Sequence, residues 1–212
     1  MKRCVIIGGA DIRDYAEQKA YLLPDDYVIY CDSGLRHAEH LGVVPDLIVG
    51  DFDSHDRPGF TGEIIALPRE KDDTDTVFGA KEGLRRGFAS FLFLGCAGNR
   101  FDHTMANVSM LFSLDTEGKS ALLIDDYSEM EVVSDTAEVS DRYPYFSLLN
   151  LTGVARGVTI THAKFPLDKG EITCEYQYGV SNEPSPGETA KISITEGRLL
   201  LVRIRKDRTQ LT

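Results

Sequence analysis

The first 126 or so residues alternate short apolar runs with stretches of helical periodicity, and this pattern constrains the fold most strongly. The runs are brief, almost continuously apolar and closed by Gly, Pro or Asp, which is typical of strands buried on both faces of a sheet. Strands that alternate with helices predict a mostly parallel sheet with helices on both faces. The predicted strands cover residues 3–9, 27–32, 46–51, 63–68, 90–96 and 120–126.

Apolar residues at three- and four-residue intervals predict three helices between these strands. The first is predicted at residues 33–42, with Ser33 as its N-cap and Gly42 just past its end. The third begins near Phe101. The second, at residues 73–87, is capped by Asp73 or Thr74, and its apolar stripe is formed by Val77, Ala80, Leu84 and Phe88.

After about residue 128 the helical period disappears and short alternating segments follow, which indicates an all-β domain. We therefore predict an α/β + all-β fold, with an N-terminal, mostly parallel α/β sheet domain at residues 1–128 and a smaller C-terminal β-sandwich domain at residues 129–212. The predicted strands of this second domain lie at residues 129–134, 146–153, 171–178, 190–195 and 198–205, with turns at Gly153, Gly157, Lys169–Gly170, Pro184–Gly187 and Glu196–Gly197.

The charge of the chain argues against a nucleic-acid partner. The formal net charge is −11, whereas binding to a phosphate backbone depends on clustered Lys and Arg. The N-terminal apolar run is too short for a signal peptide and no segment approaches the ~18 apolar residues of a membrane span. The four widely spaced cysteines form no C-x-x-C pair. We expect a cytoplasmic protein with reduced cysteines and no membrane association.

Aspartates gather at the predicted carboxyl ends of the strands, where ligands bind in open α/β sheets. Asp32 ends one strand, Asp51 and Asp53 end the next, and the segments "EKDDTD" and "GCAGNRFDH" follow two others. Any one aspartate could serve only as a helix or turn cap. As a set they favour a hard divalent cation, because Mg²⁺ is typically bound by one or two carboxylates together with nucleotide phosphates.

Known local motifs for phosphate and calcium binding are missing from the sequence. There is no G-x-x-x-x-G-K-[ST] and no G-x-G-x-x-G after a strand, and "DFDSHDRPGFTG" lacks the Gly and Glu of an EF-hand loop. The segment "GCAGNR" can still hold phosphates through its backbone amides, the following helix N-terminus and Arg100. His103, in the first turn of that helix, is a further candidate, although a lone histidine is more often structural.

The order of the motifs carries more information than any one of them. "CDSG", "LGVVPDLIVGDFDS", "EKDDTDTVFGAKEGL", "GCAGNRFDHTMAN" and "YGVSNEPSPGETAKISITEGRLLLV" resemble thiamine pyrophosphokinases in the same order and at similar spacings, over nearly the whole chain. The resemblance implies transfer of the pyrophosphoryl group of ATP to the hydroxyl of thiamine, giving thiamine diphosphate and AMP. It also implies Mg²⁺, with ATP as co-substrate, and a homodimer in which the thiamine pocket is shared between chains.

The resemblance assigns roles to individual residues. Asp51, Asp53 and Asp75 match the metal and catalytic carboxylates, and Asp102 matches a further catalytic acid. Ser181 and Asn182 of "GVSNE" match the thiamine contacts, although local sequence alone favours a turn there. The nucleotide-binding set predicted by the same match is Asp32, Ser33, Lys71, Thr74, Arg100, His103 and Asn107.

Two departures from the family pattern and two other functions stay open. The family often has "DGG" where this chain has Asp32-Ser33-Gly34, and "GLKYPL" where this chain has "HAKFPL", with His162 for glycine and Phe165 for tyrosine. One alternative is a pyrophosphokinase that acts on another alcohol, such as a hydroxymethyl pterin. The other is a non-catalytic nucleotide sensor, which would be expected to have lost the carboxylates that this chain keeps.

Overall fold

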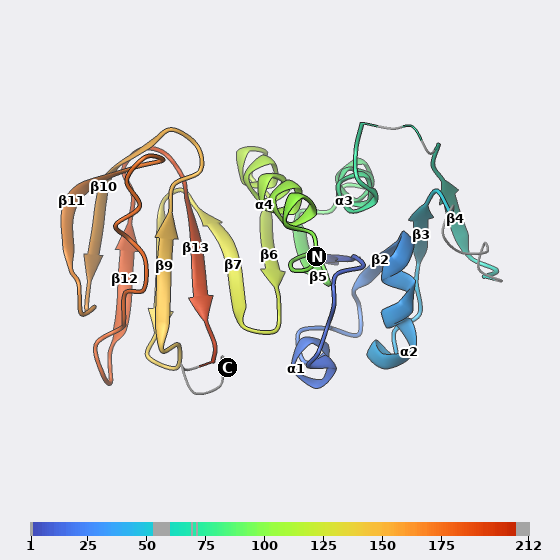
Figure 1. Ribbon diagram of the computed structural model, residues 1–212, viewed down its shortest axis with the longest axis horizontal. Helices are drawn as coiled ribbons and strands as arrows, with labels where there is room; N and C mark the ends of the chain where they lie inside the picture. Colours follow the sequence, from blue (N-terminus) through green and yellow to red (C-terminus); the bar gives the residue numbers. More distant parts are fainter. Residues whose placement is uncertain (1, 53–59, 69, 71, 207–212) are drawn as a thin grey trace. The chain divides into compact units, whose positions relative to one another are not determined.

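The structure is a computed structural model that describes residues 2–52, 60–68, 70 and 72–206. The chain divides into two compact units, Met1–Asp126 and Tyr127–Thr212 (Figure 1). Among the described residues, no helix is both long and apolar enough to cross a bilayer.

The first unit is built on a parallel sheet in which every neighbouring pair of strands is parallel. The strand order within it is β4-β3-β2-β1-β5-β6. The chain fills one side of β1 with the second to fourth strands and then crosses to the other side with the fifth, so the order reverses between β1 and β5. The strands are β1 (Cys4–Ile7), β2 (Tyr27–Cys31), β3 (Leu47–Gly50), β4 (Glu63–Ala66), β5 (Ser90–Leu94) and β6 (Ser120–Ile124).

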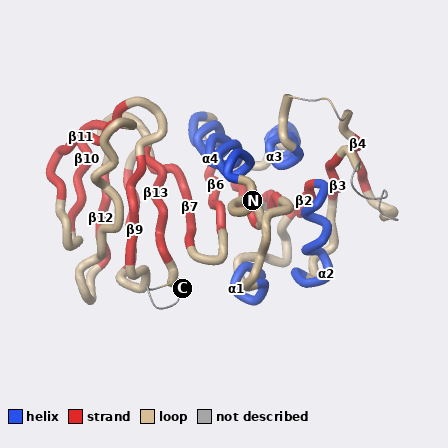
Figure 2. Tube along the Cα trace, in the orientation of Figure 1, coloured by secondary structure: helices blue, strands red, loops and turns tan. Residues whose placement is uncertain are grey.

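Helices cover both faces of this sheet (Figure 2). The helices α3 (Asp75–Arg85) and α4 (Phe101–Thr116) lie on one face, where α3 packs on β1, β2 and β3, and α4 packs on β6. The short helices α1 (Tyr15–Lys19) and α2 (Ala38–Leu41) lie on the other. There Leu41 joins Val5, Tyr30 and Leu92 in a buried apolar cluster. The predicted α/β architecture of this half is confirmed.

The structure differs from the prediction at three places in this unit. Ser33 is not an N-cap, because a 3-10 helix already begins at Asp32, after Cys31, and runs to His37 before α2. Helix α1 was not predicted, since five residues carry too little periodicity. The strand at residues 63–68 was predicted to be buried on both faces. The structure places β4 at the edge of the sheet, where it is half-buried to exposed along its length.

The buried face of α3 also differs from the predicted apolar stripe. Gly79, Ala80 and Gly83 are buried, whereas Val77 and Leu84 are only half-buried. A Cβ at Gly79 would lie 2.9 Å from the Sγ of Cys31 in β2, so α3 approaches the sheet closely through its glycines. Because glycine adds almost nothing to a hydropathy pattern, the apolar stripe predicted from the sequence did not include these two glycines.

The second unit is a β-sandwich, as predicted. One sheet contains β7, β13 and β9 in that order, and the other has the order β11-β10-β12-β8. Side chains from both sheets, including Val139, Phe146, Ile160 and Leu201, form one buried core. The strands are β7 (Ser128–Val133), β8 (Thr136–Ser140), β9 (Tyr145–Leu149), β10 (Val154–Thr161), β11 (Leu167–Thr173), β12 (Thr189–Ser193) and β13 (Leu199–Ile204).

Strands β8 and β10 and the first half of β11 were missed by the sequence analysis, and two predicted turns were wrong. Gly157 and Lys169–Gly170 lie inside the β10–β11 hairpin. The register of this hairpin shifts between Arg156 and Val158, and Lys169 has a φ of 49°. Bulges of this kind interrupt the two-residue alternation, so they resemble turns in the sequence.

Candidate active site

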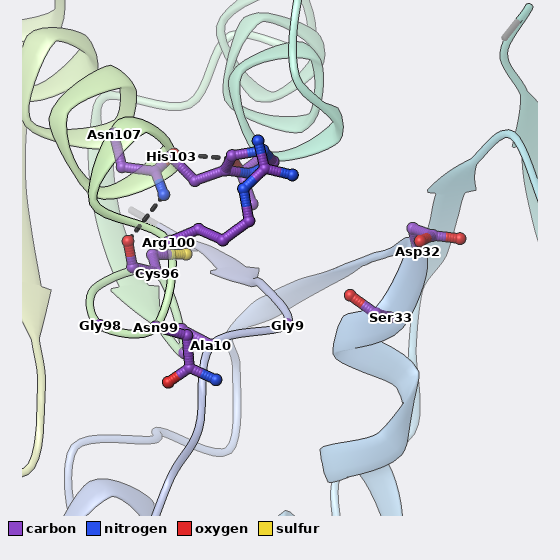
Figure 3. Close-up of a pocket in the computed structure, with 12 residues that line it drawn as sticks. Gly9, Ala10, Asp32, Ser33, Cys96, Gly98, Asn99, Arg100, His103 and Asn107 are labelled. Atoms are coloured by element: carbon purple, nitrogen blue, oxygen red, sulfur yellow. Dashed lines mark hydrogen bonds between the residues drawn. The ribbon is translucent and has the colours of Figure 1, made fainter. Parts of the chain in front are cut away.

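A pocket of about 320 Å³ opens at the carboxyl end of the parallel sheet. Its walls come from the segments after β1, β2 and β5 and from the first turns of α3 and α4, and they include Gly9, Asp32, Gly95 and Thr76. The strand order reverses between β1 and β5, so the pocket lies at the switch point where ligands of doubly wound sheets bind. Figure 3 shows Arg100, His103 and Asn107 on one side and Asp32 and Ser33 on the other.

Around the pocket, the loops after β1, β2 and β5 pack with their backbones in direct contact. A Cβ at Gly8 would lie 2.6 Å from the carbonyl oxygen of Gly95, and one at Gly34 would lie 2.2 Å from that of Ile7. A Cβ at Gly9 would lie 1.9 Å from the Oγ of Ser33, so the Ser33 side chain occupies the space that Gly9 leaves. The loops after β1, β2 and β5 can meet this closely only because these positions lack side chains.

The basic wall of the pocket contains an ion pair. Arg100 donates two hydrogen bonds to Asp102, at 3.1 Å from Nε to Oδ1 and 2.5 Å from Nη2 to Oδ2. This pairing lowers the pKa of Asp102 to about 2. Both side chains are largely exposed, so a phosphate group can compete for the guanidinium without first breaking into the core. His103 is exposed on the next residue of α4.

Two of the predicted acids, Asp32 and Asp75, act electrostatically on the buried thiol of Cys31 at the end of β2. Burial raises the pKa of Cys31 well above its usual value, and the carboxylates of Asp75 and Asp32 raise that pKa further. A Cβ at Gly50 would lie 3.2 Å from the Oδ1 of Asp32, and Asp51 is the next residue along the chain. Asp32 lines the pocket, Asp51 directly follows β3, and Asp75 is the first residue of α3.

These three carboxylates suit a cation whose coordination is completed by its substrate. Within the described residues, no three His, Cys, Asp or Glu side chains form a ready-made metal cluster. Mg²⁺ usually needs only one or two carboxylates and takes its other ligands from phosphates and water. The all-oxygen donor set fits such an ion. Two predicted residues, Asp53 and Lys71, lie outside the described residues, and their roles stay predictions.

Asn107 lines this pocket and Thr74 lies two residues before the lining residue Thr76, and both side chains bond to protein groups. Thr74 caps α3 by accepting a hydrogen bond from the backbone N–H of Val77. Asn107 is only 2% exposed and donates to the carbonyl oxygen of Cys96 at 2.7 Å. Their predicted contacts with the nucleotide stay predictions.

In the second unit, Asn182 borders a separate cavity of about 200 Å³. Its side chain is buried and bonds to the backbone of Phe165. Ser181 is exposed with a φ of 58°. His162, which stands where the family often has glycine, has a φ of 56° in the left-handed region that glycine favours. The remaining walls include Ile160, Leu167, Tyr178 and Val180.

Three residues that shape the first pocket were not singled out from the sequence. Thr76 lines the pocket and bonds to Asn107. The ring of His37 bonds to the carbonyl oxygen of Ala10, another lining residue. The carboxylate of Asp126 accepts hydrogen bonds from the backbone of Arg13 and Asp14 and so holds the end of the loop after β1. No local motif marks these residues, because their partners lie far away in the sequence.

Comparison with known proteins gives consistent results for both units. The family model for the thiamin pyrophosphokinase catalytic domain matches residues 19–123, and that for the vitamin B1 binding domain of the same enzymes matches residues 133–199. Thiamine pyrophosphokinase of Bacillus subtilis is 24% identical over 96% of this chain and 99% of its own length.

Solved structures show the same fold. The crystal structure of the Bacillus subtilis enzyme matches with a TM-score of 0.84 at 22% identity, covering 97% of this chain and all of that one. Thiamin pyrophosphokinase from Candida albicans matches with a TM-score of 0.74 at 17% identity, covering 96% of this chain and 89% of that one.

Proposed function

The chain belongs to the thiamine pyrophosphokinase family, and from this premise we propose that it transfers the pyrophosphoryl group of ATP to the hydroxyl of thiamine, giving thiamine diphosphate and AMP in a Mg²⁺-dependent reaction. The observation that carries the proposal is the pocket at the switch point of the sheet, where Asp32 and Ser33 lie opposite Arg100 and His103. An anionic polyphosphate with a bound cation is the ligand chemistry that such a pair of walls fits.

In the proposed reaction the hydroxyl oxygen of thiamine forms a bond to the β-phosphorus of ATP, and the bond from that phosphorus to the α,β-bridging oxygen breaks. AMP leaves with the bridging oxygen. The hydroxyl proton passes to a carboxylate, which we assign to Asp51 or Asp75. Transfer of this kind depends mainly on positioning and on charge stabilisation rather than on covalent chemistry with the protein.

We assign metal binding to Asp51, Asp53 and Asp75, with Asp32 and Asp102 as further acids of the site. Bound Mg²⁺ would neutralise charge on the phosphate oxygens. On the opposite wall, Arg100 offers a planar fork of donors to the phosphates once its pairing with Asp102 is exchanged. Lys71, Thr74, His103 and Asn107 complete the proposed nucleotide set, together with Ser33.

For thiamine we propose recognition by the second unit, on the support of its match to the vitamin B1 binding model. The cavity beside Asn182 is mostly apolar, with Phe165 and Tyr178 as exposed aromatic walls. Aromatic faces attract a cationic ring, and thiazolium is one. The homodimer and the cytoplasmic location implied by the resemblance also stay proposals. Light scattering tests the first. Mixing inactive Asp51→Asn chains with Asn182→Ala chains tests a shared site, because activity at a low thiamine concentration should then rise above that of the Asn182→Ala chains alone.

Mass spectrometry of the products from ATP, Mg²⁺ and thiamine tests the activity. Thiamine diphosphate with AMP is the expected result, and ADP with thiamine monophosphate would overturn the proposal. A parallel reaction with a hydroxymethyl pterin tests the alternative acceptor, and a lack of product with either alcohol, despite ATP binding, would indicate a nucleotide sensor. Chelation of Mg²⁺ with EDTA should stop product formation, and added Mg²⁺ should restore it.

A further inference from the structure

A chain of side-chain hydrogen bonds links the two helices that border the pocket. The Oγ1 atoms of Thr74 and Thr76 are 3.2 Å apart. The Oγ1 of Thr76 lies 2.6 Å from the Oδ1 of Asn107, and the Nδ2 of Asn107 lies 2.7 Å from the carbonyl oxygen of Cys96. Figure 3 shows the bond between Asn107 and Cys96.

The direction of every bond in this chain is fixed by its last member. The carbonyl oxygen of Cys96 can only accept, so the amide nitrogen of Asn107 must face it and the amide oxygen must face Thr76. Thr76 therefore donates its hydroxyl hydrogen to Asn107, and its oxygen accepts from Thr74. The oxygen of Thr74 in turn accepts from the backbone N–H of Val77 at 3.3 Å.

This series of hydrogen bonds connects three segments that carry the proposed active-site residues. Thr74 and Thr76 flank Asp75 at the start of α3, Asn107 lies in α4 four residues after His103, and Cys96 begins the loop that leads to Arg100. Because Asn107 is only 2% exposed, loss of the Thr76 hydroxyl would leave its amide oxygen away from bulk water. Thr76 is the link between α3 and α4 in this series.

We propose that Thr76 is a positioning residue whose hydroxyl fixes the first turn of α3, and with it Asp75, relative to Arg100 and His103 at the start of α4. The inference rests on the proposed function for its catalytic meaning. If phosphoryl-type transfer depends on the placement of the carboxylate against the phosphates, a shift of about 1 Å between the two helices is enough to cost roughly a hundredfold in rate. Thr76 acts through Asp75 and Asn107 and makes no contact with reacting atoms in this proposal.

Two substitutions separate the hydroxyl of Thr76 from its methyl group. Thr76→Val removes only the hydroxyl and keeps a methyl where Cγ2 packs near Gly8, at 2.9 Å from a Cβ placed there. Thr76→Ser keeps the hydroxyl and removes the methyl. We expect Thr76→Val to lower kcat about tenfold with both KM values changed by less than about threefold, and Thr76→Ser to keep kcat within about threefold of the parent.

Equal loss of kcat in the valine and serine variants would overturn the inference, because packing rather than hydrogen bonding would then matter. So would a valine variant with parental kcat. Should Thr76→Val not fold, Thr76→Cys replaces it, since cysteine differs from serine only in a much weaker hydrogen-bonding group.

A second measurement does not depend on turnover. Hydrogen exchange of the Asn107 side-chain amide, followed by NMR, should be about tenfold faster in Thr76→Val than in the parent and near parental in Thr76→Ser. Unchanged exchange in the valine variant would overturn the linkage between α3 and α4. If the parent makes no thiamine diphosphate, the proposed function fails, and the exchange data still decide whether Thr76 connects the two helices.

Discussion

The side chain of Asn182 makes hydrogen bonds to both the N–H and the carbonyl oxygen of Phe165. Its Oδ1 accepts the N–H of Phe165 at 3.0 Å, and its Nδ2 donates to the carbonyl oxygen of Phe165 at 2.8 Å. Asn182 is only 4% exposed, while Phe165, which lines the same cavity, is 58% exposed. A role in thiamine binding would therefore include placing Phe165.

Asn182→Ala should raise the KM for thiamine about three- to tenfold and leave the KM for ATP within about twofold, because Phe165 loses its two hydrogen bonds to the Asn182 side chain. The unfolding free energy should also fall, by about 1–3 kcal/mol, since buried backbone groups lose their partners. Steady-state kinetics with each substrate varied in turn, and urea denaturation, measure the two effects. Asn182→Asp keeps the acceptor for the Phe165 N–H but turns a carboxylate oxygen toward the Phe165 carbonyl oxygen, so it should also lower stability. An effect on stability alone would assign Asn182 a structural role.

Asp75→Asn should abolish most turnover while lowering the unfolding free energy by no more than about 1 kcal/mol. The carboxylate lies in the first turn of α3, where a negative charge stabilises the helix only modestly. Turnover and thermal melting are the measurements, and Asp53→Asn should behave in the same way. Melting far below the parent in both variants would indicate structural caps rather than metal ligands. Asp73→Asn is the matched control, because Asp73 bonds to Lys81 on the helix surface.

Protonation of His37 should make the fold less stable in mild acid. Its buried ring donates from Nε2 to the carbonyl oxygen of Ala10 at 3.0 Å and accepts at Nδ1 from the hydroxyl of Tyr15 at 2.7 Å, so the neutral form fits. Burial lowers the pKa of His37 below its usual value of 6.5, and the nearby Arg36 lowers that pKa further.

The unfolded chain therefore binds a proton at His37 more readily than the folded chain does. The stabilisation is complete above about pH 6.5 and is lost as the pH falls through the lower folded pKa. Urea denaturation at about pH 7.5 and about pH 5.5 should show this loss, and His37→Gln should reduce it, because glutamine can make both hydrogen bonds without titrating. An identical pH dependence in parent and variant would refute the assignment.

Glu82 should contribute more to stability than Glu63, although both pair with Arg86. Glu82 is 6% exposed and accepts hydrogen bonds from Arg85 and Arg86, whereas the side chain of Glu63 is 50% exposed. We expect Glu82→Gln to lower the unfolding free energy by about 2–3 kcal/mol and Glu63→Gln by less than about 1 kcal/mol.

The hydrogen bond from Arg85 is the main reason that the pKa of Glu82 lies below its usual value of 4.5. The stabilisation by the ionised carboxylate of Glu82 is therefore present above about pH 4.5, and it is lost as the pH falls through the lower pKa of Glu82 in the folded chain. Urea titrations of the two variants and the parent across this range measure both the size and the pH dependence. Equal losses in the two variants would contradict the prediction.

Most strands of the first unit, with β4 as the exception, could be predicted because their residues are largely buried on both faces and need no alternation to be identified. Strand β10 could not, because a half-buried strand is recognised only by its alternation, which the bulges near Gly157 break. The glycine face of α3 was missed for a related reason. Its contact with Cys31 and Phe91 depends on how closely helix and sheet approach, and glycine carries no hydropathy signal of that contact.

The sequence by itself determined the order and type of most elements, and it placed Asp32, Asp51 and Asp75 after the strands or at the start of a helix. These properties depend on residues within a few positions of one another. Only the tertiary structure decided that the segments after β1 and β5 enclose one pocket, that Thr76 bonds to Asn107 and that His37 supports Ala10. Those relationships follow from strand order and packing between distant segments, and hydropathy periods over a few residues do not encode which distant segments become neighbours.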